Sequence, residues 1–403
     1  MEEDTPALDP AKVRTMIEAC TNGSISIIEQ LVQEDPMYAR QQDETTGQSP
    51  LMAAAAVGNG GLCQNLLDMG APWNAVDRQG RCAGNYATDA QHWAVVNLLV
   101  DWGVRAELIL GMLERSQRDT NGGFLEVSQD ESMSTPGPAE QEPSTKPDYL
   151  RQRLSYSADG KALLDADKDA VMMEWERPLM KAHAQILMEG AARKRVMNVG
   201  FGMGIIDTAL QEYQPSQHII IEAHPDVYKR MLSDKWDQKP GVRIFFGKWQ
   251  DVLPQLIAEG VQLDAIFFDT YAEHSLDLED FHKQMVVLLS KPNGVYSFFN
   301  GLAPDNLFFH GVACQCVKLQ LVQLGLDSDF LPCEIQVKDE VWEGIRRKYW
   351  HGRDTYYLPR CTWNVNFLTT GNLEDNAIVE DARKRVSLEG TAAEASMKRQ
   401  KMT

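Results

Sequence analysis

Short apolar runs alternate with amphipathic stretches through the second half of the chain. Each run has the length of a buried strand, is rich in Val, Ile or Phe, and is bounded by Gly, Pro, Asn or Asp. Because strands that alternate with helices favour a parallel sheet, the pattern predicts a doubly wound α/β domain at residues 148–370. The strands are expected at 196–199, 217–222, 242–246, 263–269, 295–300, 334–337 and 362–368.

The first part of the chain follows a different pattern, in which helical stretches recur at a fixed spacing. Residues 13–20 and 24–32 predict two short amphipathic helices, and Gly47 and Gly80 begin related segments 33 residues apart. A period of 33 is that of ankyrin repeats, and the run G-Q-S-P-L-M-A-A-A-A-V-G-N from Gly47 resembles their consensus. We therefore expect a small all-α domain of ankyrin-like repeats at residues 1–114. Such repeats either dock a protein substrate or cap the next domain, and the sequence leaves both readings open.

Two segments have few apolar residues. Residues 115–147 are rich in Pro, Gly, Ser and Glu, and residues 371–403 are similar, so we expect a disordered linker and a disordered tail. The tail carries basic clusters at 383–385 and 398–399, which are either a nuclear-import signal or part of a solvated tail.

Composition narrows the class of protein. A chain of 403 residues with 43% apolar residues has room for more than one domain, and its formal net charge of −19 argues against duplex nucleic-acid binding and favours basic partners. The seven cysteines form no C-x-x-C pair, so we expect reduced thiols, an intracellular protein and no metal site. The N-terminal sequence lacks the pattern of a signal peptide and no apolar run is long enough to span a membrane, so no membrane association is expected. The sequence carries no signal for oligomeric state, and a monomer is expected.

The strongest candidate site is the run V-G-F-G-M-G that follows the first predicted strand. Gly200, Gly202 and Gly204 allow a sharp turn from strand to helix, and Glu222 ends the next strand, where the ribose hydroxyls of a nucleoside accept an acidic partner. The spacing G-x-G-x-G differs from the G-x-G-x-x-G of dinucleotide folds, and no arginine-rich phosphate clamp follows. S-adenosylmethionine, which has a ribose but no phosphate, is the better ligand.

Five motifs in order carry a family resemblance. They are V-M-M-E-W-E-R-P-L-M from Val171, V-G-F-G-M-G from Val199, I-I-E-A-H from Ile220, G-K-W-Q-D-V from Gly247 and F-F-D-T-Y from Phe267. This set resembles guanidinoacetate methyltransferase. With ankyrin-like repeats in front, the whole chain resembles the fungal protein arginine δ-nitrogen methyltransferases of type IV, which implies a Rossmann-like class I methyltransferase fold.

The resemblance assigns roles to residues of this chain. Glu176 and Asp269 match the two carboxylates that hold the guanidino group and accept its proton, and a guanidinium with its planar N–H donors suits such partners. Asn198 departs from the family pattern, which has an acid there, although an amide oxygen can still accept a hydrogen bond. The positions that match the S-adenosylmethionine site are Tyr156, Met172, Met180, Gly200, Phe201, Gly202, Met203, Gly204, Ile205, Ile206, Glu222, Ala223, His224, Lys248, Trp249 and Asp269.

The resemblance also implies the reaction. Guanidinoacetate is methylated on the nitrogen that carries its carbon chain, and the equivalent atom of an arginine side chain is the δ-nitrogen. The expected function is methylation of that atom in a protein of the large ribosomal subunit, in the cytoplasm and nucleus. Two alternatives are a small-molecule guanidino methyltransferase with an ankyrin appendage, and a non-enzymatic ankyrin scaffold with an inactive second domain.

Overall fold

The computed structural model of the chain describes residues 8–121, 146, 148–190, 193–271, 275–350 and 354–370. These residues form two compact units, each described here by itself. Unit 1 combines Met1–Ala139 with Leu302–Cys316, and unit 2 combines Glu140–Gly301 with Val317–Thr403. The C-terminal tail and most of the expected linker lie outside the described residues. The helices that could be examined include none that is both long and apolar enough to cross a membrane.

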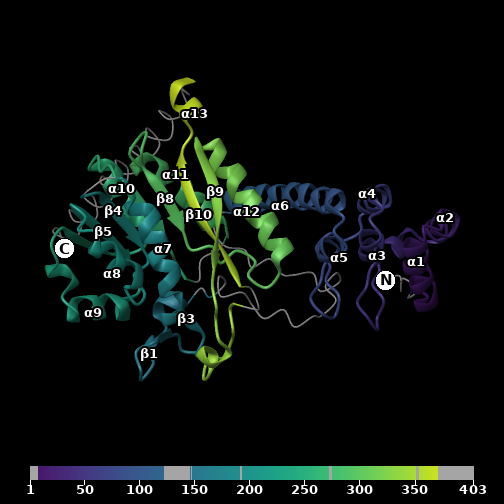
Figure 1. Cartoon of the computed structure of the whole chain (residues 1–403), viewed down its shortest axis with the longest axis horizontal. Helices are drawn as coiled ribbons and strands as arrows, with labels where there is room; N and C mark the ends of the chain where they lie inside the picture. The colour runs from purple at the N-terminus through teal and green to yellow at the C-terminus, as the bar shows by residue number, and fades with distance from the viewer. Residues whose placement is uncertain are drawn as a thin grey trace, which may run out of the picture. The chain divides into compact units, whose positions relative to one another are not determined.

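Unit 1 is built from helical pairs, as predicted (Figure 1). Polar residues fix where its helices begin: the Ser49 side chain accepts the N–H of Met52, and Asn59 accepts the N–H of Leu62. The helices of the repeats are α1 (Pro10–Asn22), α2 (Ile25–Glu34), η1 (Pro36–Ala39), α3 (Pro50–Ala56), α4 (Gly60–Asp68), α5 (Ala83–Asp89) and α6 (Trp93–Asn121). The expected linker thus begins later than residue 115, because α6 continues to Asn121.

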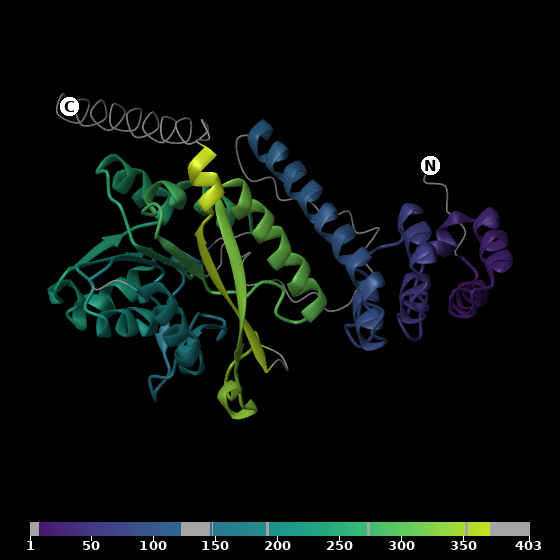
Figure 2. The ribbon, with the colours of Figure 1, turned by 45° about the horizontal axis from the view of Figure 1, so that its top comes forward.

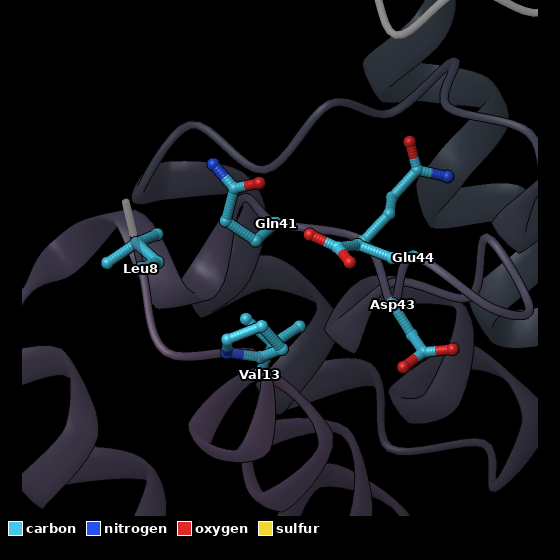
Figure 3. A pocket seen from close by; sticks show the side chains of 7 residues that line it. Leu8, Val13, Gln41, Asp43 and Glu44 are labelled. Atoms are coloured by element: carbon cyan, nitrogen blue, oxygen red, sulfur yellow. The ribbon is translucent and has the colours of Figure 1, made fainter. Parts of the chain in front are cut away.

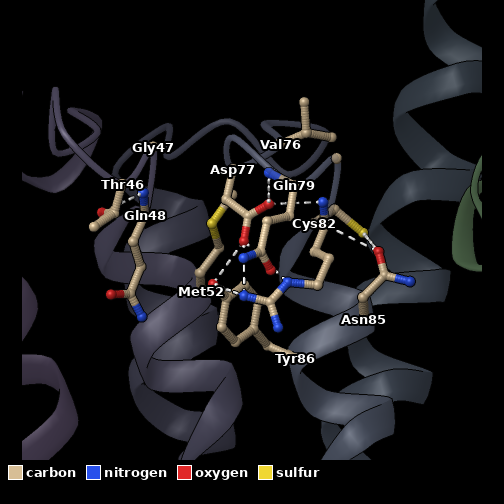
Figure 4. A network of polar contacts seen from close by, with 12 residues as sticks. Thr46, Gly47, Gln48, Met52, Val76, Asp77, Gln79, Cys82, Asn85 and Tyr86 are labelled. Carbon is tan, nitrogen blue, oxygen red and sulfur yellow. Dashed lines mark hydrogen bonds and ion pairs between the residues drawn. The ribbon is translucent and has the colours of Figure 1, made fainter.

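The loop before α5 is held by a buried carboxylate (Figure 4). Asp77 accepts the backbone N–H groups of Gln79 and Arg81 at 2.8 and 2.9 Å, and its Oδ2 accepts the Tyr86 hydroxyl at 2.8 Å. The next residues, R-C-A-G-N, have lost the ankyrin consensus, yet Asn85 Oδ1 accepts the N–H of Cys82 at 2.9 Å and so starts the helix. The hydrogen bond between Asn85 and Cys82 therefore starts the helix of this repeat in place of the lost consensus residues.

A segment distant in sequence completes the core of unit 1, which the sequence did not predict. Phe308, Val312 and Cys316, at the start of α12 (Leu307–Gln323), are buried with the repeat helices. Asn306 Nδ2 donates to the carbonyl of Gly80 at 3.0 Å and to Asn85 Oδ1 at 2.7 Å. The repeats therefore bury apolar surface against residues 302–316. The first domain is not limited to the expected residues 1–114, because it also includes this later segment.

Unit 2 is a doubly wound α/β domain, which confirms the predicted fold class. Its seven-stranded sheet has the order β6-β5-β4-β7-β8-β10-β9, parallel from β6 to β8, with β10 antiparallel to both neighbours. A three-stranded sheet of order β1-β2-β3 precedes it. The strands are β1 (Ser155–Tyr156), β2 (Ala162–Leu164), β3 (Ala170–Met173), β4 (Arg195–Val199), β5 (Gln217–Glu222), β6 (Val242–Phe246), β7 (Ala265–Phe268), β8 (Val295–Phe298), β9 (Leu326–Glu334) and β10 (Thr355–Trp363).

Helices pack against the sheet of unit 2, and the two views in Figures 1 and 2 show them around its strands. Besides the end of α12, they are α7 (Arg177–Met188), α8 (Ile205–Glu212), α9 (Pro225–Ser233), α10 (Trp249–Ala258), α11 (Ser275–Leu288) and α13 (Val365–Thr370). Shorter 3-10 turns are η3 (Tyr149–Arg151), η4 (Glu174–Glu176), η5 (Trp236–Gln238) and η6 (Asp339–Trp342).

The last two strands differ from the prediction. The expected strands at 334–337 and 362–368 are replaced by β9 and β10, and Val365–Thr370 is helical. The residues of β9 alternate between buried and exposed only at its start, because β9 lies at the sheet edge and pairs with β10 alone. An edge strand of this kind lacks the continuous apolar run that revealed the central strands.

The packing of unit 1 predicts that residues 302–316 are part of its stability. Phe308 is 7% exposed, so Phe308→Ala should lower the free energy of unfolding of unit 1 by about 3 kcal/mol, through lost burial and the cavity left behind. Hydrogen exchange of the α3 and α5 amides measures this locally. The neighbouring Leu307 is 50% exposed, and Leu307→Ala is the control, with an expected change within about 0.5 kcal/mol. Equal effects of the two substitutions would contradict the assignment.

Candidate active site

The glycine turn after β4 approaches the end of β7 closely. Gly200 has a φ of +93°, and a Cβ there would collide with the carbonyl oxygen of Asp269. A backbone of this conformation at this distance needs glycine. The Asp269 N–H also donates to the carbonyl of Val199 at 2.9 Å. The turn that the sequence singled out and the carboxylate that the resemblance singled out are therefore neighbours.

Glu222 ends β5 and holds this turn. Its Oε2 accepts the N–H of Phe201 at 2.9 Å and that of Gly202 at 3.4 Å, and its Oε1 accepts the N–H of His224 at 2.6 Å. Burial raises the pKa of Glu222, while these N–H groups act in the opposite direction. The expected role of Glu222 is to bind ribose hydroxyls, and the structure adds that Glu222 organises the glycine turn, so its loss would affect both.

Two other expected cofactor positions, Tyr156 and Met172, contact the turn, and a third, His224, lies next to Glu222. The Tyr156 hydroxyl donates to the carbonyl of Gly202 at 3.2 Å, and the Met172 sulfur accepts the N–H of Met203 at 3.2 Å. His224 lies just beyond Glu222, where its Nδ1 accepts the Asp226 N–H that begins α9 and its Nε2 donates to the carbonyl of Gln152.

The remaining expected cofactor positions differ in exposure. Met180, Ile205 and Ile206 are buried in one apolar cluster of unit 2, and Trp249 is buried with Phe268 and Phe281. Such residues shape a site by packing. Ala223 is half-buried and Lys248 is exposed, immediately before α10.

Asn198, the departure from the family pattern, belongs to a buried polar network. Its Nδ2 donates to the carbonyl of Gly200 and to Asp207 Oδ2, both at 2.8 Å, and Asp207 Oδ1 lies 3.0 Å from His218 Nε2. Because an amide can donate to Asp207 where a second carboxylate would be repelled, the asparagine suits this chain. Sequence reasoning missed Asp207 and His218, which are polar residues inside otherwise apolar elements.

Glu176 and Asp269 form a pair of buried carboxyl groups. Glu176 ends η4, directly before α7, and its Oε1 accepts the Met173 N–H at 3.0 Å and the hydroxyl of Tyr349. Asp269 follows β7, and its Oδ2 is buried without a hydrogen-bond partner among the described residues. Burial raises the pKa of Glu176 to about 8, with Asp269 adding to the effect, and burial raises the pKa of Asp269 to about 7.

These two groups can receive a planar cation. Near neutral pH, two buried carboxyl groups without a counter-ion hold protons in part, whereas a guanidinium brings positive charge and several N–H donors. One of these N–H donors would give Asp269 Oδ2, which is buried without a partner among the described residues, the hydrogen bond that it lacks. The arrangement suits binding of a guanidino group and acceptance of a proton from it.

Two other features of the described residues are weaker candidates for a functional site. Asp165, Asp167 and Asp169 could hold a metal ion, but the Lys146 ammonium already bonds to all three. A pocket of about 280 Å³ in unit 1 (Figure 3) has Asp43 in its lining, and Asp43 is already paired with Arg14.

Comparisons with known proteins find two family models and several curated relatives that match this chain. Residues 144–309 match the family model for guanidinoacetate N-methyltransferase, and residues 16–108 match that for ankyrin repeats in three copies. Curated relatives carry the description protein arginine N-methyltransferase 2. That of Emericella nidulans is 35% identical over 83% of this chain and 84% of its own length. That of Saccharomyces cerevisiae is 34% identical over 74% and 76%, and that of Yarrowia lipolytica is 43% identical over 54% and 47%.

Among solved structures, spermidine synthase from Thermotoga maritima is similar over 55% of this chain and 73% of its own, with a TM-score of 0.40 and 13% identity. A similarity of this size carries no argument about function.

The raised pKa values predict an unusual pH dependence of stability. A carboxyl group whose pKa is higher in the folded than in the unfolded state stabilises the fold most at low pH, and loses this contribution as pH rises toward its folded pKa. For Glu176 that window extends from about 4.5 to about 8. In the ligand-free protein, Glu176→Gln should therefore raise the melting temperature relative to wild type increasingly between pH 5 and pH 9, on the order of 5 °C at the upper end.

The matched control is Glu174→Gln, two residues away, where Glu174 pairs with Arg177 in a partly exposed position. Its melting temperature relative to wild type should stay level over the same range. A Glu176→Gln difference that is flat with pH would show that Glu176 titrates normally.

Proposed function

Because the chain belongs to the protein arginine N-methyltransferase 2 family, we propose that it transfers the methyl group of S-adenosylmethionine to the δ-nitrogen of arginine residues in proteins. Family membership makes the chain a protein-arginine N-methyltransferase. What we propose beyond this is the identity of the methyl donor, the nitrogen atom that is methylated and the protein substrate. The observation that supports them is the buried, unpartnered Oδ2 of Asp269 beside the glycine turn and Glu176.

The chain's residues fit the cofactor. The glycine turn and Glu222 lie at the carboxyl ends of adjacent parallel strands, where doubly wound sheets bind nucleosides. Glu222 Oε1 accepts one backbone N–H, which leaves acceptor capacity for a hydroxyl. S-adenosylmethionine, when bound, supplies an electrophilic methyl group on its sulfonium. Tyr156, Met172, Phe201 to Gly204, Glu222 to His224, Lys248 and Trp249 would hold it, with Met180, Ile205 and Ile206 supporting them from the core.

The carboxyl groups have distinct tasks. Glu176, fixed by two donors to Oε1, orients the guanidino group, and Asp269 binds its other side. A guanidinium has no free lone pair, so it must lose a proton as the new N–C bond forms, and Asp269 accepts that proton. The match to guanidinoacetate N-methyltransferase supports the δ-nitrogen, because that nitrogen carries the carbon chain.

The proposed substrate is a basic protein of the large ribosomal subunit. A net charge of −19 favours a basic partner, and ankyrin repeats commonly bind proteins. The proposal places the chain in the cytoplasm and nucleus as a monomer, without duplex nucleic acid or membrane as partner. All seven cysteines are free, in keeping with a reducing compartment.

The central test is Asp269→Asn. The change keeps the shape of the side chain and removes the proton acceptor, so we expect the methylation rate to fall about 100-fold or more while calorimetry shows S-adenosylmethionine binding retained. Asp329→Asn, on the exposed face of β9, is the matched control with normal rate expected. Fragmentation mass spectrometry of the wild-type product should place the methyl on the δ-nitrogen. A terminal methyl, or a normal rate for Asp269→Asn, would refute the proposal.

Docking through the repeats predicts a preference for whole proteins. The kcat/KM on an intact substrate protein should exceed that on a short peptide with the same arginine by about tenfold or more, since extra surface adds binding energy. The full chain is needed for this comparison, because removing the repeats would expose Phe308 and Val312. Equal kcat/KM values would make the repeats a structural cap, and methylation of guanidinoacetate in place of protein would favour a small-molecule enzyme.

A further inference from the structure

The connection between β9 and β10 brings an aromatic cluster to Glu176. Within residues 339–350, here called the aromatic segment, Trp342 and Tyr349 pack with ring centroids 5.0 Å apart. Both rings also pack against Trp175, at 5.9 and 5.7 Å, and Trp175 directly precedes Glu176. The Tyr349 ring thus packs against two tryptophans that also contact each other, which restricts its rotamers.

A backbone hydrogen bond and an ion pair anchor the same segment to the β2–β3 hairpin. The Arg346 N–H donates to the carbonyl of Lys168 at 3.0 Å, and its guanidinium forms a bidentate pair with Asp169. Lys146 also bonds to Asp169, at 2.8 Å. Since bidentate Arg–carboxylate pairs fix orientation as well as distance, the aromatic segment has a defined position over η4.

The Tyr349 hydroxyl donates to Glu176 Oε1, which also accepts the Met173 N–H. Among the described residues, Oε2 of Glu176 accepts no hydrogen bond. Two donors on one oxygen fix the rotation of the carboxyl group and leave the other oxygen for a ligand. The titratable groups that face the Glu176 carboxyl are Tyr349 from the aromatic segment and Asp269 from the end of β7.

We propose that Tyr349 is a positioning residue for arginine methylation, which orients Glu176 through its hydroxyl so that Oε2 is presented to the guanidino group. This inference rests on the proposed function and adds to it a residue that acts through Glu176 alone. The hydroxyl also favours the ionised carboxylate, because a donated hydrogen bond lowers the pKa of Glu176 against the effect of burial. Without it, Glu176 stays protonated to higher pH.

The test is Tyr349→Phe in the full chain, which keeps the ring packed against both tryptophans and removes only the hydroxyl. We expect kcat/KM for arginine substrate to fall on the order of ten- to a hundredfold, mainly through KM, and the acidic limb of its pH profile to move to higher pH. Affinity for S-adenosylmethionine should be unchanged, which also shows that the variant folds. Trp342→Phe alters the same cluster without a bond to Glu176, and its acidic limb should coincide with that of the wild type.

A double-mutant cycle tests whether Tyr349 acts through Glu176. In a Glu176→Gln background, Tyr349→Phe should cost less than threefold, because the oriented carboxylate is already gone. A loss as large as in the wild-type background, or a Tyr349→Phe enzyme with an unshifted profile and kcat/KM within twofold of wild type, would overturn the inference.

A readout without turnover separates this inference from the proposed function. Carbon-13 NMR of glutamate carboxyl groups follows the titration of Glu176, with Glu176→Gln to assign its signal. The midpoint should move to higher pH in Tyr349→Phe, and an unchanged midpoint would refute the bond. If the wild-type protein methylates no arginine, the proposed function fails, while this titration still decides the role of Tyr349.

Discussion

The burial of two carboxyl groups without a counter-ion is the constraint on which the site depends. Glu176 and Asp269 are each buried, and the described residues bring no cation to them. Such a pair is unfavourable in the ligand-free protein, and the proposed binding of a cationic guanidino group would relieve this cost. In the proposed function, the same burial that destabilises the pair makes it selective for a cation, because a neutral ligand could not compensate for the carboxylate charge.

The parallel sheet of unit 2 brings the candidate site residues together at one edge. Parallel strands end at one edge, so the turn after β4, Glu222 at the end of β5 and Asp269 after β7 lie together although they are far apart in sequence. Gly200 permits the contact with Asp269, and the amides of the turn bind Glu222. The glycine turn and Asp269, to which we assign cofactor binding and proton acceptance in the proposed function, are therefore rigidly linked through neighbouring strands.

A second set of contacts reaches the site from the other end of the domain. His183 on α7 bonds to Ser297 at 2.7 Å and to Tyr356 at 2.9 Å, which ties the helix after Glu176 to β8 and β10. Burial lowers the pKa of His183 to about 3, so this link stays neutral. The β9–β10 connection adds Tyr349, whose hydroxyl donates to Glu176. Residues after 295 thus set the geometry of a carboxyl group at 176.

The resemblance to a known family singled out Glu176 and Asp269. The sequence by itself determined the central strands, the glycine turn and the repeat period, because each depends on residues close together or on a fixed spacing. It could not reveal β9 as an edge strand, the burial of Phe308 with the repeats, the Asn198–Asp207–His218 network, or Tyr349, which lies 173 residues from Glu176. These features join residues distant in the chain and leave no periodic signal. Only the tertiary structure decided them, because burial and hydrogen bonding depend on what the fold brings together.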